Sequence, residues 1–523
     1  MRIVSMPALF AASLTLALSG CGGGDSDSHI VATDKGAVQG TNSNGALRFL
    51  GIPYAAPPVG PLRWQAPAAA AAWTNVRDGS VFGPHCAQVG GSFGTASSAE
   101  DCLYLNVFTP TSGPGPFPVM VWIHGGALVS GESDDYDPSA LVANGVAVVT
   151  LNYRLGPLGF LSHAALSAEA GGASGNYGLM DQQAALRWVK TNIAAFGGDP
   201  ANVTVFGESA GGLSTFSQIV SPLAAGLFQK AIVESGSYNL TPPTLATAQT
   251  WGANFATGAG CTDQSAACLR ALPVATVLAN AAALQVSGST APTVDGKVLT
   301  KTLVDAFASG SFNKVAVIAG TNQHEYSLLS AVTIDVALGH PVTAAMYPAE
   351  VNGIFGASLG GAVQALYPLS SALTPAQTLD DALTDGVFTC NSRKAAGLIA
   401  AAGSTVYAYE FADPNAPMVF KIPPRPEGYG AYHAAEIQYV FPGTYVVYFG
   451  APFTAAQSTL SSQMVGYWTQ FAKTGNPNAA GTSTWPAYTA ASDTYLTLAP
   501  GAVATTNQVS AQHNCSTFWT PGI

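Results

Sequence analysis

The 523-residue chain is predicted to be an α/β protein with a mostly parallel central sheet. Short apolar runs alternate along it with helix-compatible stretches, the order expected when helices cover both faces of a parallel sheet. The runs are nearly continuous in hydrophobicity, as strands buried on both faces should be. They lie at residues 118–123, 146–152, 203–206 and 315–319.

A helix is expected at residues 181–195, between the second and third of these strands. Its apolar side chains Leu186, Val189 and Ile193 recur at helical spacing. The Gly-Gly-Asp-Pro run at 197–200 is a helix stop, so the helix should end before it.

One large domain is expected over residues 30–523, because no linker-like stretch divides the chain after residue 30. Ala-rich stretches at 241–310 and 360–405 are predicted to be helical. We interpret them as insertions into the α/β core that roof a pocket.

The composition favours a large core over a charged surface. Hydrophobic residues make up 48% of the chain and charged residues 9%. The net charge is −11, and the 18 Lys and Arg residues do not cluster. Because affinity for nucleic acid is built from clustered Lys and Arg, the sequence excludes a nucleic-acid partner.

The first 20 residues are predicted to be a signal peptide of the lipoprotein type. Arg2 precedes an apolar run at 6–18, which suits a secretory signal and is too short to span a membrane. The run ends at Leu18-Ser19-Gly20-Cys21, which resembles a bacterial lipobox. An ordinary signal peptide with an incidental cysteine is the alternative.

We therefore expect Cys21 to be lipidated and residues 21–29 to form a flexible tether. The protein would be exported to the cell envelope, facing the periplasm or the exterior of a bacterial membrane, or secreted. Membrane attachment would depend on acyl chains alone.

The cysteine count agrees with export. Lipidation of Cys21 leaves six cysteines for three bridges, and fifteen pairings are possible. The six are Cys86, Cys102, Cys261, Cys268, Cys390 and Cys515. No Cys-x-x-Cys pair or zinc-type spacing with histidine occurs, so neither a metal site nor a cofactor is predicted.

Ser209 is the candidate nucleophile. It is the centre of Gly207-Glu208-Ser209-Ala210-Gly211, which follows the apolar run 203–206 and precedes a helix-compatible stretch. This is the strand, sharp turn and helix order of a nucleophile elbow. Two other Gly-x-Ser-x-Gly matches, around Ser92 and Ser358, lack a preceding strand and are interpreted as loop serines.

A serine hydroxyl needs a base within hydrogen-bond reach and an acid that orients the base. Among eight histidines, His433 lies far downstream of Ser209, where the order nucleophile, acid, histidine places the base. Glu325 follows the predicted strand 315–319 and is the candidate acid, with a solvated loop carboxylate as the alternative.

A third motif, His124-Gly125-Gly126-Ala127, directly follows the predicted strand 118–123. Small residues there let backbone N–H groups approach a developing oxyanion. Gly126 and Ala127 are the candidate donors, and the N–H of Ala210 would complete the set.

Together these motifs resemble the type-B carboxylesterase and cholinesterase family from about Gly36 to Phe518. Other segments fall in the family's order too. They are Arg48–Ala55, Glu100–Val107, Asn152–Gly156, Gly175–Gln182 and Glu234–Ser237.

The resemblance implies an α/β-hydrolase fold and the triad Ser209, Glu325 and His433. It also implies that Ser235 supports the acid and that Glu208 lies beside the nucleophile. The bridges it implies are Cys86–Cys102, Cys261–Cys268 and Cys390–Cys515. The ion pairs it implies are Arg48–Glu100 and Arg154–Asp181.

Two departures from the family bear on the site. His324-Glu325-Tyr326 stands where relatives commonly read Asp-Glu-Gly. The segment between Cys86 and Cys102 has no tryptophan to stack on a quaternary ammonium, so choline esters are not expected as preferred substrates.

The predicted function is a serine carboxylesterase that acts through an acyl-enzyme on small to medium uncharged esters. The same machinery on carbamate, amide, feruloyl or polyester bonds is the first alternative. A non-catalytic, cholinesterase-like binding protein is the second. The sequence predicts no particular oligomeric state.

Overall fold

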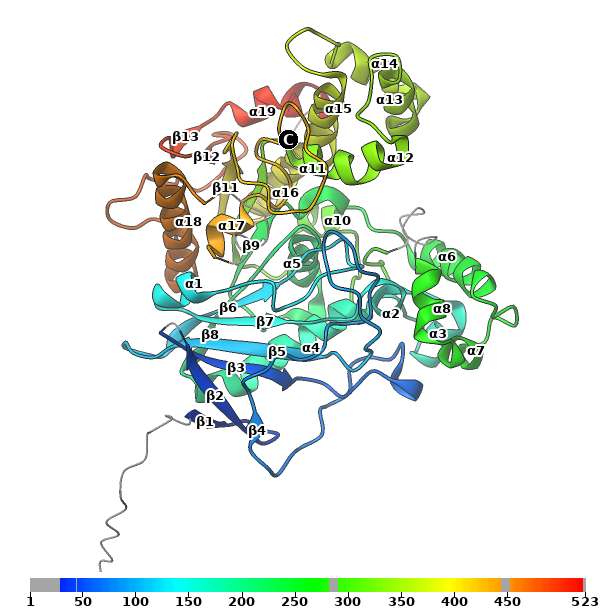
Figure 1. Ribbon diagram of the computed structural model, residues 1–523, viewed down its shortest axis with the longest axis vertical. Coiled ribbons are helices and arrows are strands. Elements are labelled where there is room, and N and C mark those ends of the chain that lie inside the picture. The colour runs from blue at the N-terminus through cyan, green and yellow to red at the C-terminus, as the bar shows by residue number, and fades with distance from the viewer. Residues whose placement is uncertain (1–28, 44, 282–289, 444–451, 521–523) are drawn as a thin grey trace, which may run out of the picture.

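The computed structural model describes residues 29–43, 45–281, 290–443 and 452–520 (Figure 1). The predicted signal peptide, Cys21 and all of the tether except His29 lie outside these residues. His29 itself is the first residue of strand β1.

Within the described residues, 13 strands form one sheet, in the order β1-β2-β3-β5-β7-β6-β8-β9-β10-β11-β12-β13, with β4 paired to β2. The strands are β1 (His29–Ala32), β2 (Ala37–Ser43), β3 (Ala46–Pro53), β4 (Arg77–Asp78), β5 (Tyr104–Pro110), β6 (Phe117–Ile123), β7 (Ala147–Leu151), β8 (Gly198–Glu208), β9 (Lys230–Glu234), β10 (Ala316–Asn322), β11 (Val406–Phe411), β12 (Tyr495–Leu498) and β13 (Ala504–Thr506). The helices are α1 (Ser139–Ala143), α2 (Gly156–Phe160), α3 (Ala164–Glu169), α4 (Tyr177–Asn192), α5 (Ala210–Val220), α6 (Leu245–Gly258), α7 (Ala266–Ala271), α8 (Val274–Ala279), α10 (Leu303–Ala308), α11 (Glu325–Ser330), α12 (Val336–Leu338), α13 (Tyr347–Phe355), α14 (Ala357–Leu366), α15 (Pro375–Leu383), α16 (Cys390–Ala401), α17 (Ile437–Val440), α18 (Ala455–Thr474) and α19 (Val509–Gln512).

The middle of the sheet is parallel, and its edges are antiparallel except for the short β2–β4 pair, which is parallel. From β7 through β6, β8, β9, β10 and β11 to β12, every neighbouring pair is parallel. Antiparallel pairs join β1, β2, β3, β5 and β7 at one edge and β12 with β13 at the other. All four predicted strands are present, as β6, β7, β8 and β10, and the α/β prediction is confirmed.

Both faces of the central strands are buried, which explains their nearly continuous hydrophobicity. Along β6, Val119, Val121 and Ile123 belong to one hydrophobic core, and Met120 and Trp122 belong to a second core on the opposite face. Helices α4, α5, α10 and α16 contribute to the first core, and α1, α17 and α18 contribute to the second (Figure 1). Each core is therefore a helix layer packed on one face of the sheet.

The predicted helix at 181–195 corresponds to α4 and a 3-10 turn at Ile193–Phe196. The chain leaves the helix at Gly197, whose φ of 82° suits a glycine helix terminus. Residues 198–200, predicted to belong to the stop, instead begin β8. Gly198 is held there by pairing with Phe117 of β6, a contact between distant segments that local sequence signals do not reveal.

The second Ala-rich stretch is largely helical, as expected, and the first is helical over about half of its described residues. The first contains α6, α7, α8 and α10, and part of it (282–289) lies outside the described residues. The second contains most of α14, all of α15 and α16, and a π-helical segment at Thr384–Thr389. Among the described helices, none combines the length and apolar character needed to cross a bilayer.

Candidate active site

Ser209 occupies a sharp turn between β8 and α5. Its φ of 54° is a left-handed conformation, which costs a non-glycine residue on the order of 1–3 kcal/mol. The flanking glycines are steric requirements of this junction. A Cβ at Gly207 would lie 2.5 Å from the carbonyl oxygen of Ile123, and a Cβ at Gly211 would lie 1.9 Å from the same atom. The helix can approach the neighbouring strand this closely only with glycine at both positions.

The structure brings the three predicted residues into one hydrogen-bonded chain. His433 Nε2 lies 2.8 Å from Ser209 Oγ, and His433 Nδ1 lies 2.6 Å from Glu325 Oε2. When Nδ1 donates its proton to the carboxylate, Nε2 is left as an acceptor for the serine proton.

The Glu325 carboxylate is fully buried at the first turn of α11. Its Oε1 accepts hydrogen bonds from Ser235 Oγ at 2.6 Å and from the backbone N–H of Asn322 at 2.8 Å. Two donors therefore fix one oxygen, and the other oxygen faces His433. Ser235 reaches this position from a strained turn after β9, with a φ of 50°.

Gly126 and Ala127 form a tight turn directly after β6. Their φ values are 92° and 55°, and a Cβ on Gly126 would lie 2.1 Å from the carbonyl oxygen of Ser130. Both residues line the same cavity as Ser209. Ala210 is the first residue of α5, where backbone N–H groups have no partner within the helix and favour negative charge.

Glu208 is buried beside the nucleophile, with one carboxylate oxygen 3.3 Å from His433 Nε2. Burial raises its pKa well above the usual range, and the nearby charges of Glu325 and Glu234 raise it further. This direction favours the neutral form of Glu208, whereas Glu325 has two hydrogen-bond donors on its carboxylate.

His124 also lies at the site and plays a different part. Burial lowers its pKa to about 4, so the ring is neutral near pH 7. The ring stacks on Tyr153 at 4.4 Å, and its Nδ1 lies 2.9 Å from the carbonyl oxygen of Gly125. It shapes the Gly-Gly turn.

A second histidine–carboxylate cluster lies elsewhere in the domain. His513 Nε2 is 2.8 Å from Glu410, and His513 Nδ1 contacts Asp385 on the other side of the ring. Burial alone would lower the pKa of His513, but these two carboxylates raise it to about 10. Its ring is therefore a buried imidazolium.

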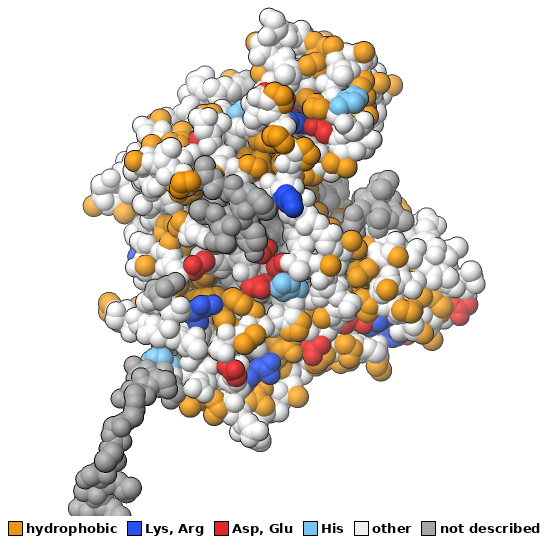
Figure 2. All heavy atoms as spheres, viewed as in Figure 1, with side chains coloured by type: hydrophobic (Ala, Val, Ile, Leu, Met, Phe, Trp, Pro, Cys, Tyr) orange, Lys and Arg blue, Asp and Glu red, His pale blue; other side chains and the backbone are white. Residues whose placement is uncertain are grey.

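Two hollows meet at Ser209. One is a cavity of about 340 Å³. It is lined by Ser209, His433, the Gly-Gly turn and part of the Cys86–Cys102 segment. The other is about 300 Å³ and has mainly apolar walls, including Leu213 and Phe388. Thr290, Ala291 and Val387 also line it, so the Ala-rich insertions do reach the pocket. Figure 2 shows few and scattered Lys and Arg side chains on the face viewed.

The other two Gly-x-Ser-x-Gly serines are not at strand–helix junctions. Ser92 lies in a turn of the Cys86–Cys102 segment, as expected, and lines the 340 Å³ cavity. Ser358 lies inside helix α14, so its assignment to a loop was wrong. The turn signal at Asn352-Gly353 misled the prediction, because both residues continue helix α13.

The structure contains the three implied disulfides, Cys86–Cys102, Cys261–Cys268 and Cys390–Cys515.

One of the two implied ion pairs is present, and the prediction of the other is wrong. Arg154 Nε lies 2.8 Å from Asp181 Oδ2. Glu100 pairs with Arg63, at 2.6 Å, instead of Arg48. Arg48 lies opposite Phe108 in the β3–β5 ladder, and its guanidinium lies 5.9 Å from the Phe108 ring.

Two residues at the site were not predicted. Asn322 donates its backbone N–H to Glu325; it is the last residue of β10 and lies three residues past the end of the predicted strand 315–319. Phe388 packs on the His433 ring at 5.1 Å from within the second Ala-rich insertion, where no local signal marks it. Among the described residues, no group of three or more His, Cys, Asp or Glu side chains is arranged to hold a metal ion.

A serine at a strained strand–helix junction, facing an imidazole backed by a buried carboxylate, is the arrangement of the serine hydrolases. Comparison with known proteins makes the assignment more specific. The carboxylesterase family profile matches residues 27–518, and the chain belongs to this family.

The similarity to known esterases and a related hydrolase extends over most of each chain. The chain is 37% identical to para-nitrobenzyl esterase of Bacillus subtilis (strain 168), with 88% of this chain and 92% of the relative covered. It is 36% identical to acylcarnitine hydrolase of Mus musculus, with 87% and 84% covered. A solved structure of a thermophilic para-nitrobenzyl esterase superimposes with a TM-score of 0.79 at 35% identity, covering 92% of this chain and 98% of that one. The fold is therefore the α/β-hydrolase fold, and the protein is a carboxylesterase.

Proposed function

We propose that Ser209, His433 and Glu325 cleave carboxylic esters in two steps through an acyl-enzyme. The observation that supports this most strongly is the hydrogen-bonded chain from Ser209 Oγ through His433 to Glu325. The reaction requires no metal or cofactor.

In the first step, Ser209 Oγ attacks the ester carbonyl as its proton moves to His433 Nε2. The buried Glu325 carboxylate stabilises the imidazolium that forms. The backbone N–H groups of Gly126, Ala127 and Ala210 hold the oxyanion of the tetrahedral intermediate. The bond to the alcohol then breaks, and His433 gives its proton to the leaving oxygen.

In the second step, water attacks the acyl group on Ser209. His433 takes the proton of this water, and a second tetrahedral intermediate forms in the same donor set. Its collapse releases the acid and returns the proton to Ser209.

The substrates proposed are small to medium uncharged esters. Two hollows of about 340 and 300 Å³ are both lined by Ser209, and together they have room for a group of modest size on each side of the ester bond. The similarity to a para-nitrobenzyl esterase supports aromatic esters as test substrates.

Removal of the nucleophile is the test. Ser209→Ala should lower kcat for a short-chain 4-nitrophenyl ester on the order of a million-fold, with circular dichroism unchanged. Ser358→Ala, in the unrelated match in α14, is the matched control and should keep full activity. Retained turnover in Ser209→Ala would rule out the assignment.

We further propose that the protein is exported and anchored by lipid on Cys21. The sequence motif at 18–21 and the three disulfides support this. Mass spectrometry of the mature N-terminus tests it. A diacylglyceryl mass on Cys21 is expected, and an unmodified cysteine or cleavage at another residue would contradict it.

A further inference from the structure

One wall of the 340 Å³ cavity is a segment without helices or strands. Residues 91–95 line the cavity, and they lie in the chain between Cys86 and Cys102. Gly91, Ser92 and Thr95 are exposed to solvent. Such a wall has little packing of its own and needs other contacts to keep its shape.

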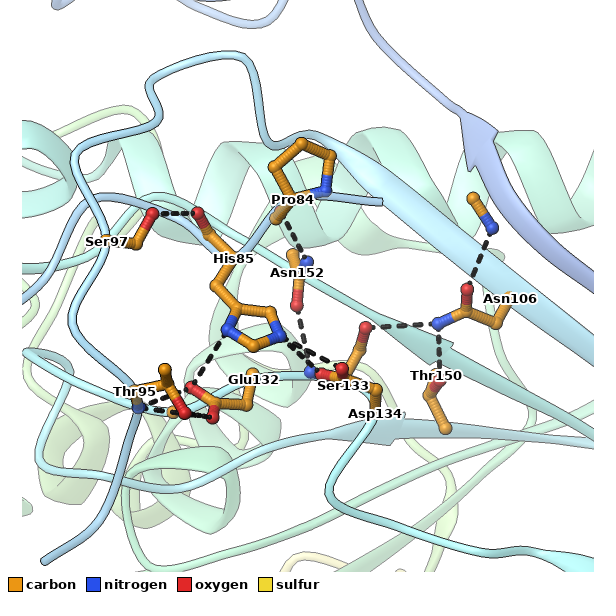
Figure 3. A network of polar contacts seen from close by, with 12 residues as sticks. Pro84, His85, Thr95, Ser97, Asn106, Glu132, Ser133, Asp134, Thr150 and Asn152 are labelled. Carbon is orange, nitrogen blue, oxygen red and sulfur yellow. Dashed lines mark hydrogen bonds and ion pairs between the residues drawn. The ribbon is translucent and has the colours of Figure 1, made fainter. Parts of the chain in front are cut away.

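Glu132, which lines the same cavity, supplies those contacts. The residue is buried, with 3% of its surface exposed. Its Oε1 accepts a hydrogen bond from Thr95 Oγ1 at 2.7 Å, and its Oε2 accepts from Thr95 N at 3.0 Å and from Gln88 Nε2 at 3.3 Å. Figure 3 shows the carboxylate turned toward Thr95. A buried carboxylate thus holds an otherwise exposed loop residue through charge-assisted hydrogen bonds.

The same network keeps Glu132 in place. Gln88 Oε1 accepts from Gly131 N at 2.8 Å, and Gln88 Nε2 donates to Gly131 O at 3.1 Å. His85 lies 3.6 Å from Glu132 and 2.9 Å from Asp134 (Figure 3). The loop is therefore fastened to the segment that follows the Gly126–Ser130 turn.

The hydrogen bonds to Thr95 also hold the nearby side chain of Phe93, which lines the cavity. Phe93 lies two residues before Thr95, and its ring meets Phe420 edge to face at 5.1 Å. Both rings line the cavity, and Phe420 belongs to the segment that leads to His433. The position of Phe93 therefore determines how much room a bulky ester group finds beside Ser209.

We propose that Glu132 is a specificity-determining positioning residue: by holding Thr95 it fixes Phe93 and shapes the cavity for bulky ester groups. The inference rests on the proposed ester cleavage at Ser209. Glu132 acts through the loop, so it should affect the binding of bulky substrates and leave the chemical step unchanged.

Three esters test this proposal: methyl acetate, benzyl acetate and methyl phenylacetate. In Glu132→Gln, kcat/KM for at least one aromatic ester should fall about tenfold, the loss expected for a charge-assisted hydrogen bond. The loss should appear in KM, because the loop is no longer held in its binding shape. For methyl acetate, kcat/KM should stay within about twofold of the parent.

Variants of Thr95, the residue that Glu132 holds, ensure that the test does not depend on a single substitution. Thr95→Val should reproduce the loss more weakly, Thr95→Ser should behave as the parent, and Glu132→Gln/Thr95→Val should be no worse than Glu132→Gln alone. Glu169→Gln, which removes an ion pair to Arg270 outside the cavity, is the control and should change none of the three esters.

Two results would overturn the proposal. One is an unchanged kcat/KM for both aromatic esters, and the other is an equal loss for methyl acetate. If the parent protein hydrolyses none of the three esters, the proposed function fails as well. If the parent hydrolyses them and the variants show no selective loss, only the role of Glu132 fails.

Discussion

Two buried histidines of this protein each contact carboxylates, yet only one is placed to move a proton. His433 has a carboxylate at Nδ1 and the hydroxyl of Ser209 at Nε2, and it lines both hollows. His513 has a carboxylate at each nitrogen. Its pKa of about 10 keeps it an imidazolium near neutral pH.

The difference lies in the partner of the second ring nitrogen. A hydroxyl can give up and take back a proton as a reaction proceeds, so His433 can cycle between its two forms. A second carboxylate instead stabilises the imidazolium permanently, and His513 becomes a fixed charge that ties Asp385 to Glu410. We expect the first cluster to determine the rate and the second to determine stability.

Among the variants that compare the two clusters, the largest effect is expected on the rate, from the acid of the first cluster. Glu325→Gln should lower kcat on the order of ten-thousand-fold, because an amide no longer fixes the tautomer or stabilises the imidazolium. Steady-state kinetics on a 4-nitrophenyl ester measure this. Glu410→Gln is the matched control in the second cluster, and it should change kcat only a few-fold. Similar losses of kcat in both variants would abolish the distinction.

The second cluster should show its effect in unfolding. His513→Gln leaves two buried carboxylates without their shared cation, and such a loss typically costs about 3–5 kcal/mol. Urea denaturation should show this decrease in the free energy of unfolding, while kcat at 25 °C stays within a few-fold of the parent. A variant as stable as the parent would mean that the His513 cluster does not hold the fold together.

A smaller effect is expected from Ser235, one of the donors to Glu325. Ser235→Ala removes a hydrogen bond to a charged group, worth about 1.5–3 kcal/mol, so kcat/KM should fall on the order of ten- to hundred-fold. Ser237→Ala is the control, because the Ser237 hydroxyl is buried without a hydrogen-bond partner among the described residues. Equal activities of the two variants would show that Ser235 does not support the acid.

The second cluster should also make the stability depend on pH. Because the folded pKa of His513 lies above its unfolded value of about 6.5, its stabilisation is complete below that pH. The stabilisation is lost as the pH rises through about 10. The difference in Tm between the parent and His513→Gln should therefore shrink between pH 7 and 10.5. A difference that grows over this range would contradict the assignment of His513 as an imidazolium.

The two clusters also differ in how far the sequence could predict them. Ser209 is marked by a local pattern whose glycines are steric requirements, and the order of motifs along the chain then led to Glu325 and His433. The His513 cluster joins the π-helical segment, the end of β11 and the C-terminal region, and none of its members stands in a recognisable motif.

Contacts between loops escaped prediction for the same reason. Glu100 pairs with Arg63 instead of Arg48. Glu132 accepts hydrogen bonds from Thr95. Both contacts depend on how loops fold back on one another. Periodicity describes strands and helices, which were predicted correctly at the centre of the sheet. It carries no information about contacts between irregular segments.

The central claim is that Ser209, activated by His433, becomes acylated. A fluorophosphonate probe followed by mass spectrometry of the proteolytic peptides tests this directly. We expect one adduct, on Ser209, which is hydrogen-bonded to His433. None is expected on Ser92 or Ser358, because neither hydroxyl has a hydrogen bond to a histidine among the described residues. An adduct on another serine, or an active protein that resists the probe, would contradict the account.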